Sequence, residues 1–193
     1  MLKGIALTIV LMMLCSFYAN TTFANQVSHA EGLEAVIKEK LLQDGNDIKS
    51  SVKVELIRLD KVPQKNYYTA LFSFKAHSST YLGEASFIKE NDEYEYAGGH
   101  GYGVNRINQT TITLDNQLYS VIYGENFNKR ISSISARFPN KTFKYNINWI
   151  DSPYFVHFQK LPTTNMKEVY PSKITCYDQK HHKLTWHQCA RVK

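Results

Sequence analysis

The first regular hydrophobic spacing falls on residues 28–45 and predicts an amphipathic helix. Apolar residues recur three or four positions apart, which places them on one face of a helix. These residues are Leu33, Val36, Ile37, Leu41 and Leu42. Ser28 and Glu31 have the spacing of a capping box, and Gly45 is suited to the left-handed residue that often ends a helix. We therefore expect one helix with a single buried face.

From residue 51 onward, apolar residues recur at every second position, which is typical of strands with one buried face. The predicted strands of the first half are 51–59, 66–77, 81–89 and 93–97. Those of the second half are 110–114, 117–123, 131–138, 142–148 and 153–160, followed by a terminal hairpin. The fold class that this order predicts is α+β. An N-terminal helix packs on an antiparallel sheet, and a β-sandwich-like C-terminal half follows.

Residues 98–109 interrupt the strand pattern with a cluster of glycines, GGHGYGVNRINQ. Such a stretch offers few side chains for packing, so we expect a loop or linker here. The predicted organisation has four parts. They are a signal peptide (1–24), a helix-on-sheet half (25–97), the glycine-rich linker (98–109) and a β-rich half (110–193).

The N-terminal segment 1–24 has the features of a secretory signal. Lys3 precedes an almost uninterrupted apolar run, and Thr22 and Ala24 are small residues suited to cleavage after Ala24. We therefore expect a secreted protein, extracellular or associated with the cell envelope. Two alternatives stay open, an uncleaved anchor and lipidation of Cys15. No further transmembrane segment is expected once the signal is removed.

The net charge of +6 favours attraction to anionic polymers or membranes. The alternative is ordinary solubilising charge, because the basic residues are dispersed along the chain. No run of five basic residues occurs, so we expect no specific binding of nucleic acid. The unknown partner is expected among extracellular or envelope ligands.

Cys176 and Cys189 are the cysteines that remain after signal removal, and in an exported protein such a pair predicts a disulfide. An alternative is a zinc site that uses these cysteines with His181, His182 or His187. The spacing matches no familiar zinc motif, so no metal or other cofactor is expected. A third possibility keeps the disulfide and lets these histidines bind metal.

Catalytic signatures are missing from the sequence: it contains neither a G-x-S-x-G nor an H-E-x-x-H motif. We therefore expect a non-enzymatic protein that binds a polymer, a peptide or a partner protein. Aromatic residues on the predicted strands support this expectation, since exposed aromatics can stack on ligands, although most should fill the core. The alternative is a secreted hydrolase that uses His100 or His157 in a cleft between the two halves.

The second half also carries a recognisable order of strand motifs, YSVIYGENFNKRISSISARF, KYNINWIDSPYFVHFQ and KITCYDQ. Over residues 117–187 this order resembles small exported, largely uncharacterised β-rich proteins of Gram-positive bacteria. The resemblance implies export and a β-rich fold. Residues 179–182 depart from the pattern, which has a glycine turn at this point.

Overall fold

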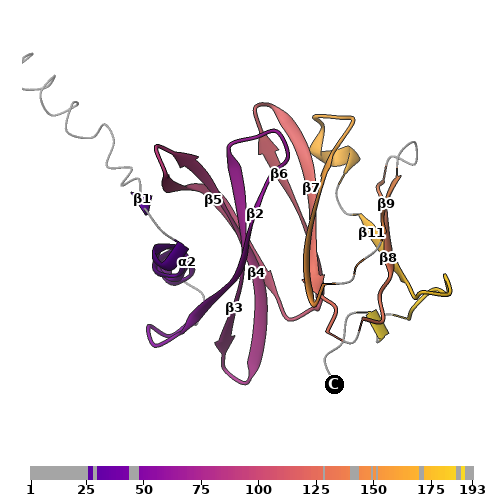
Figure 1. Ribbon diagram of the computed structural model, residues 1–193, viewed down its shortest axis with the longest axis horizontal. Coiled ribbons are helices and arrows are strands. Elements are labelled where there is room, and N and C mark those ends of the chain that lie inside the picture. The colour runs from indigo at the N-terminus through magenta and orange to yellow at the C-terminus, as the bar shows by residue number, and fades with distance from the viewer. Residues whose placement is uncertain are drawn as a thin grey trace, which may run out of the picture.

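The structure is a computed structural model of the 193-residue chain (Figure 1). The described residues are 26–27, 30–43, 48–127, 129–139, 144–148, 150, 152–169, 172–185 and 188–189. For residues 26–27, 30–31, 99–100 and 144–145 the description covers the backbone only. The predicted signal peptide therefore lies outside the described residues, as does Gly45.

One helix and three antiparallel sheets form the described fold, which confirms the predicted α+β class. The first sheet, sheet A, contains five strands in the order β1-β5-β4-β3-β2. Sheet B has the order β10-β7-β6, and sheet C has the order β11-β8-β9. The helix is α2 (Ala30–Gln43), and a short 3-10 helix η1 covers Met166–Glu168. The strands are β1 (Gln26–Val27), β2 (Val54–Lys61), β3 (Tyr67–Ala76), β4 (Ser79–Glu90), β5 (Glu93–Gly103), β6 (Ile107–Leu114), β7 (Gln117–Glu125), β8 (Ser133–Arg137), β9 (Lys144–Asn148), β10 (Tyr154–Lys160) and β11 (Lys173–Tyr177).

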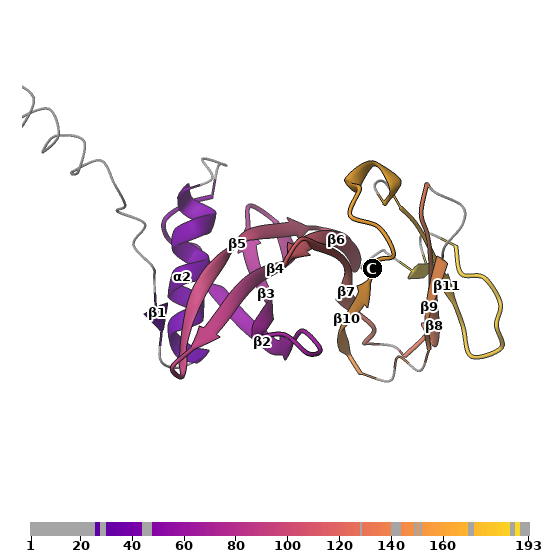
Figure 2. The same ribbon diagram turned by 90° about the horizontal axis from the view of Figure 1, so that it is seen from above.

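The helix α2 covers one face of sheet A, as the sequence predicts (Figure 2). Four of its five predicted face residues are buried, and the fifth, Leu42, is half-buried. The helix meets aromatic side chains of β3 and β4, among them Phe72 and Phe87, which have no exposed surface. Burial of a large apolar side chain contributes about 2 kcal/mol, so this contact is the main force that holds the helix. The structure does not test the predicted capping box, because Ser28 and the side chain of Glu31 are not described.

Glu34 adds a polar link between the helix and the edge of sheet A. Its Oε1 accepts a hydrogen bond of 2.8 Å from the backbone N–H of Leu56 in the edge strand β2. An edge strand has unpaired N–H groups, and this carboxylate satisfies one of them.

Sheets A, B and C follow one another as layers beyond the helix (Figure 2). The faces of sheets A and B share a buried cluster that includes Leu71, Leu82 and Val121. The opposite face of sheet B packs on sheet C through a second cluster, which includes Ile122, Ile134 and Cys176. Sheets B and C therefore form the β-sandwich-like half that the sequence predicts.

The predicted glycine-rich linker over residues 98–109 is wrong. Residues 98–103 are the second half of β5 and pair with β4, and β6 begins at Ile107. Glycine is used here for close approach: a Cβ on Gly103 would lie 2.7 Å from the side chain of Asn108. A run of glycines in a strand resembles a loop in the sequence, because backbone pairing leaves no pattern in the side chains.

Candidate functional site

A polar cavity lies between sheets A and B, with a volume of about 290 Å³. Its walls come from β3, β4 and β5 on one side and from β6 on the other. We call it the Glu84 cavity, because Glu84 is the only carboxyl-bearing or basic residue among its described lining residues. These residues are Tyr67, Glu84, Ser86, Ala97, Gly98, Thr110, Thr111, Ile112, Thr113 and Leu114.

Alternation along strand β4 brings Glu84 to this cavity. Ala85 and Phe87 point to the helix, so Glu84 and Ser86 point to sheet B. Thr69 of β3 is the cross-strand partner of Ser86 and lies on the same face. Glu84 is 2% exposed, Ser86 5% and Thr69 0%. The sheet therefore buries a carboxyl and two hydroxyls side by side.

Three oxygen atoms of this group have no hydrogen-bond partner among the described residues. They are Glu84 Oε2, Ser86 Oγ and Thr69 Oγ1. Buried polar atoms in native proteins are nearly always hydrogen-bonded, and leaving one without a partner costs about 1–3 kcal/mol. The cluster therefore holds three of the six buried side-chain atoms that have no hydrogen-bond partner among the described residues.

Burial also controls the protonation of Glu84. It raises the pKa of the Glu84 carboxyl from 4.5 to about 8, although a hydrogen bond from the backbone of Gly101 acts in the opposite direction. No basic side chain lies among the described residues of the cavity wall to compensate the carboxylate. Burial, with a smaller effect from Glu84, also raises the pKa of Tyr123, whose hydroxyl donates to Gly101 O at 3.4 Å. Glu84 is thus mostly a neutral acid at pH 7.

Strand β5 is irregular where it borders the Glu84 cavity. The register of β4 and β5 shifts on both sides of Ser86, whose partner is Gly98. Gly98 has a φ of +88°, which side-chain-bearing residues rarely adopt, and a Cβ there would meet nothing within 4 Å. Bulges of this kind are common beside binding sites, since they redirect the strand.

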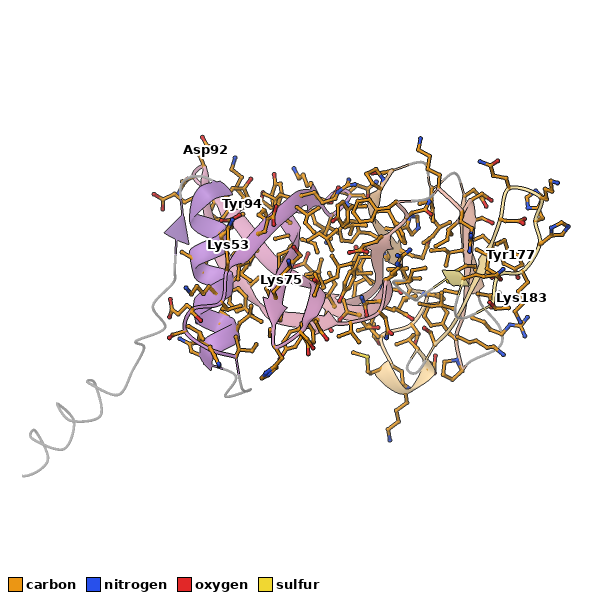
Figure 3. All side chains as sticks on the ribbon, turned by 90° about the horizontal axis from the view of Figure 1, so that it is seen from below. Lys53, Lys75, Asp92, Tyr94, Tyr177 and Lys183 are labelled. Carbon is orange, nitrogen blue, oxygen red and sulfur yellow. A yellow bond between two sulfur atoms is a disulfide. The ribbon has the colours of Figure 1, made fainter. Side chains whose placement is uncertain are left out.

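A second cavity, of about 570 Å³, lies where β2 begins and the β3–β4 hairpin turns. We call it the lysine cavity. Its walls include Lys49, Lys53 and Lys75, all exposed, and His77. Glu55 is the single acidic residue among the described residues of the wall. Figure 3 shows Lys53 and Lys75 in the half of the molecule that carries α2, far from the terminal hairpin.

The lysine cavity is electropositive. None of its lysines forms an ion pair with another described residue, whereas Lys65 and Lys89 elsewhere pair with aspartates. Ammonium groups on long side chains, free of partners and close to one another, attract phosphate and carboxylate groups.

A third depression, of about 680 Å³, runs beside sheet C. Its lining is largely uncharged and combines the apolar Ile131 and Ile150 with polar residues, among them Ser133, Asn148 and His181. It gathers less positive charge than the lysine cavity.

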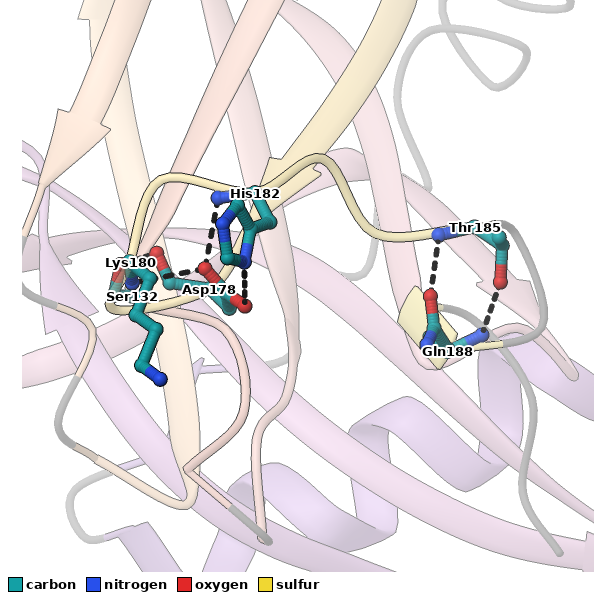
Figure 4. A network of polar contacts seen from close by, with 6 residues as sticks. All are labelled: Ser132, Asp178, Lys180, His182, Thr185 and Gln188. Atoms are coloured by element: carbon teal, nitrogen blue, oxygen red, sulfur yellow. Dashed lines mark hydrogen bonds and ion pairs between the residues drawn. The ribbon is translucent and has the colours of Figure 1, made fainter.

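The predicted disulfide between Cys176 and Cys189 is present, with an Sγ–Sγ distance of 2.07 Å and a Cα–Cα distance of 6.2 Å. The terminal hairpin also has a polar network (Figure 4). Asp178 Oδ1 accepts hydrogen bonds from the backbone N–H groups of Lys180 and His182, at 2.9 and 2.8 Å. The bond from His182 contributes most to the lowered pKa of Asp178.

The histidines proposed as metal ligands do not gather in the structure. His182 Nδ1 lies 3.3 Å from Asp178 Oδ2, and His181 is an exposed turn residue with a φ of 61°. His187 is outside the described residues. Across the described part of the chain, no group of three or more His, Cys, Asp or Glu residues is arranged to hold a metal ion. The cysteines are bonded to each other, so they offer no thiolate.

Of the two histidines proposed for catalysis, the structure describes the side chain of His157 alone. His157 is half-buried in β10, and burial lowers its pKa. It is not among the residues that line the Glu84 cavity or the lysine cavity. The side chain of His100 is outside the description.

Most strand-borne aromatics that the structure describes belong to the core beneath the helix. Tyr68 and Tyr94 contact each other at 5.2 Å, and Phe74 contacts Tyr81 and Tyr102 at 5.0 and 5.2 Å. Trp149, Tyr170 and Trp186 lie outside the described residues. The described aromatics therefore support the core interpretation more than an exposed stacking surface.

The sequence analysis singled out neither Glu84 nor the lysines. The sequence contains a feature that could have identified Glu84: it is the only carboxylate within the predicted strand 81–89. It alternates with Leu82 and Ser86 on the face opposite the helix. The lysines gave no signal, because Lys75 is distant in sequence from Lys49 and Lys53 and meets them only through strand pairing.

Comparison with known proteins finds no match: no family model, no curated protein and no solved structure is similar to the chain. None of the helices within the described residues is long and apolar enough to cross a membrane.

Proposed function

We propose that the chain is a secreted, non-enzymatic protein that binds an anionic polymer of the cell envelope through the lysine cavity. The observation that carries this proposal is the group of Lys49, Lys53 and Lys75 around one open depression, with a single acidic residue in its described wall. The N-terminal sequence and the disulfide support an oxidising, extracellular location.

The shape and chemistry of the lysine cavity favour a polymer over a small metabolite. The lysines are exposed and border a depression at the surface, so a chain can pass across them without being enclosed. Lysine binds phosphate as a point charge and does not require a fixed orientation of the anion. A polymer that carries regularly spaced phosphates or carboxylates fits these requirements.

A hydrolase has weaker support. No described histidine side chain lines the Glu84 cavity, and Glu84 is the only carboxylate in its described wall. Glycoside hydrolysis ordinarily requires two carboxylates on opposite sides of the scissile bond.

The test compares binding to poly(glycerol phosphate) and to neutral dextran by biolayer interferometry. We expect binding of the phosphate polymer alone, with an affinity that falls as salt is added. Replacement of Lys49, Lys53 and Lys75 by alanine should weaken binding by about 100-fold, at roughly 1 kcal/mol for each lysine near an anionic surface.

A matched control distinguishes the effect of the lysine cavity on binding from the effect of the net charge of the protein. Replacement of Lys160, Lys167 and Lys173 by alanine removes the same charge from exposed positions outside the lysine cavity. This variant should lose no more than about threefold in affinity if the cavity is the site. Equal losses for the two variants, or equal binding of dextran, would contradict the proposal.

A further inference from the structure

The Glu84 cavity is separate from the proposed polymer site and has the opposite electrostatic character. The lysine cavity is open and positive, whereas the Glu84 cavity has one buried carboxyl and no described basic side chain in its wall. The two cavities share no lining residue within the described part of the chain. The following inference therefore does not depend on the proposed function.

We propose that the Glu84 cavity binds a small ligand that carries a protonated amine. Glu84 provides the opposite charge when it is ionised, and the hydroxyls of the lining residues Ser86 and Thr111 accept hydrogen bonds from the ligand or from water that bridges to it. Glu84 Oε2, Ser86 Oγ and Thr111 Oγ1 are buried atoms of the cavity wall for which the described protein offers no partner.

The chemistry of the wall determines the class of ligand. Its side chains present carboxyl, hydroxyl and phenol oxygens together with apolar groups, and no described cation competes for Glu84. An ammonium group has several N–H donors and one positive charge, so it satisfies neighbouring acceptors and balances the carboxylate at the same time.

A divalent metal fits this wall less well. Calcium takes six to eight oxygen ligands, usually with several carboxylates among them, and magnesium also relies on carboxylates. Glu84 is the sole acidic residue of the described wall. A neutral polyol would satisfy the hydroxyls but would leave the carboxylate without a counter-charge.

The dimensions of the cavity also limit the ligand. A volume of about 290 Å³ suits a compact molecule and excludes a folded partner or a branched polymer. At Gly98 the bulged strand leaves open space beside the cavity, because a Cβ at this position would meet no atom within 4 Å. A side chain at this position would narrow the cavity at its border with β5.

The test uses putrescine as the amine probe and 1,4-butanediol as its neutral isostere. Titration calorimetry at pH 8.5 should show saturable binding of putrescine by the intact protein and none of the diol. Glu84→Gln should weaken putrescine binding by at least about tenfold, the loss expected for a hydrogen bond to a charged group. Ser86→Ala should weaken it by about threefold, as expected for a neutral hydrogen bond.

Control variants keep the result interpretable. Glu90→Gln removes an exposed carboxylate from the same strand and should leave putrescine binding unchanged. The variant without Lys49, Lys53 and Lys75 should still bind putrescine, and Glu84→Gln should still bind poly(glycerol phosphate). Because glutamine removes a buried charge, Glu84→Gln is expected to fold, and a thermal melt checks this.

Several results would overturn the inference. A single buried ion pair should give a dissociation constant of about 1 mM. The absence of putrescine binding at concentrations up to about 10 mM is therefore one such result. Equal binding by the wild-type protein and by Glu84→Gln is another. Preference for the diol would indicate a polyol site, and binding of Mg²⁺ or Ca²⁺ in place of putrescine would indicate a metal site.

Discussion

Replacement of Glu84 by glutamine should stabilise the protein, and the gain should grow with pH. The Glu84 carboxyl is 2% exposed, and burial raises its pKa from 4.5 to about 8. Glutamine has nearly the same shape and can still accept a hydrogen bond from Gly101, but it cannot ionise. The substitution therefore removes the cost of burying a charge without opening a cavity.

The size of the effect follows from proton linkage. Below about pH 4.5 the folded and unfolded states are both protonated at Glu84, so the carboxyl contributes no pH dependence. Between pH 4.5 and about 8 the unfolded chain ionises first, so the free energy of unfolding of the wild-type protein falls as pH rises. At about 1.4 kcal/mol per pH unit, the loss is about 3 kcal/mol at pH 7 and about 5 kcal/mol above pH 8.

Urea unfolding at a series of pH values from 4 to 9 measures this difference. Subtraction of the wild-type curve from the Glu84→Gln curve cancels the groups that titrate equally in both proteins. We expect a difference that is small at pH 4, increases through neutral pH and becomes constant above pH 8. Glu90→Gln, at an exposed position of the same strand, should give a constant difference. A constant difference for Glu84→Gln as well would refute the assignment of a buried, neutral carboxyl.

Other substitutions test other parts of the fold, each by urea unfolding at pH 7. Gly98→Ala should cost about 1–2 kcal/mol through backbone strain at a φ of +88°, and an unchanged midpoint would contradict this conformation. Asn126→Ala should cost about 3 kcal/mol, because this buried side chain makes three hydrogen bonds with backbone groups; a loss below about 1 kcal/mol would exclude them. Joint replacement of Cys176 and Cys189 by alanine should cost about 3 kcal/mol under oxidising conditions, and reduction of the wild-type protein should have a similar effect.

The regular elements were largely predictable from the sequence. The helix was predicted over 28–45 and is described over Ala30–Gln43, because its apolar residues repeat with the helical period and pack on one sheet face. Asp115 and Asn116, which separate the predicted strands 110–114 and 117–123, form a tight turn: both residues have positive φ, of 49° and 59°, and they join paired strands. Tight hairpins require such residues, so this signal is local and reliable.

The glycine-rich strand was not predictable in the same way. Its pairing with β4 is made by backbone groups, and Gly101 lies beside a residue distant in sequence, Glu84. The cavities were not predictable for the same reason, because their walls also come from segments distant in sequence. Glu84 is recognisable as unusual in its strand, but the lack of partners for its Oε2 depends on what sheet B places opposite it.

The disulfide was predictable because the cysteines outside the predicted signal form a single pair, and the structure contains their bond. The predicted signal, the site of cleavage and the resemblance to exported β-rich proteins stay predictions. N-terminal sequencing of the protein recovered from the culture medium or the cell envelope would test the first two, with Asn25 expected as the first residue.

Hydrogen exchange with and without poly(glycerol phosphate) tests the proposed binding site most directly. If the polymer binds the lysine cavity, protection should increase in residues 49–55 and 73–80, which form its walls, and should stay unchanged in sheet C. Protection confined to sheet C or to the terminal hairpin, or no change in any segment at saturating polymer, would contradict the assignment of the lysine cavity as the polymer site.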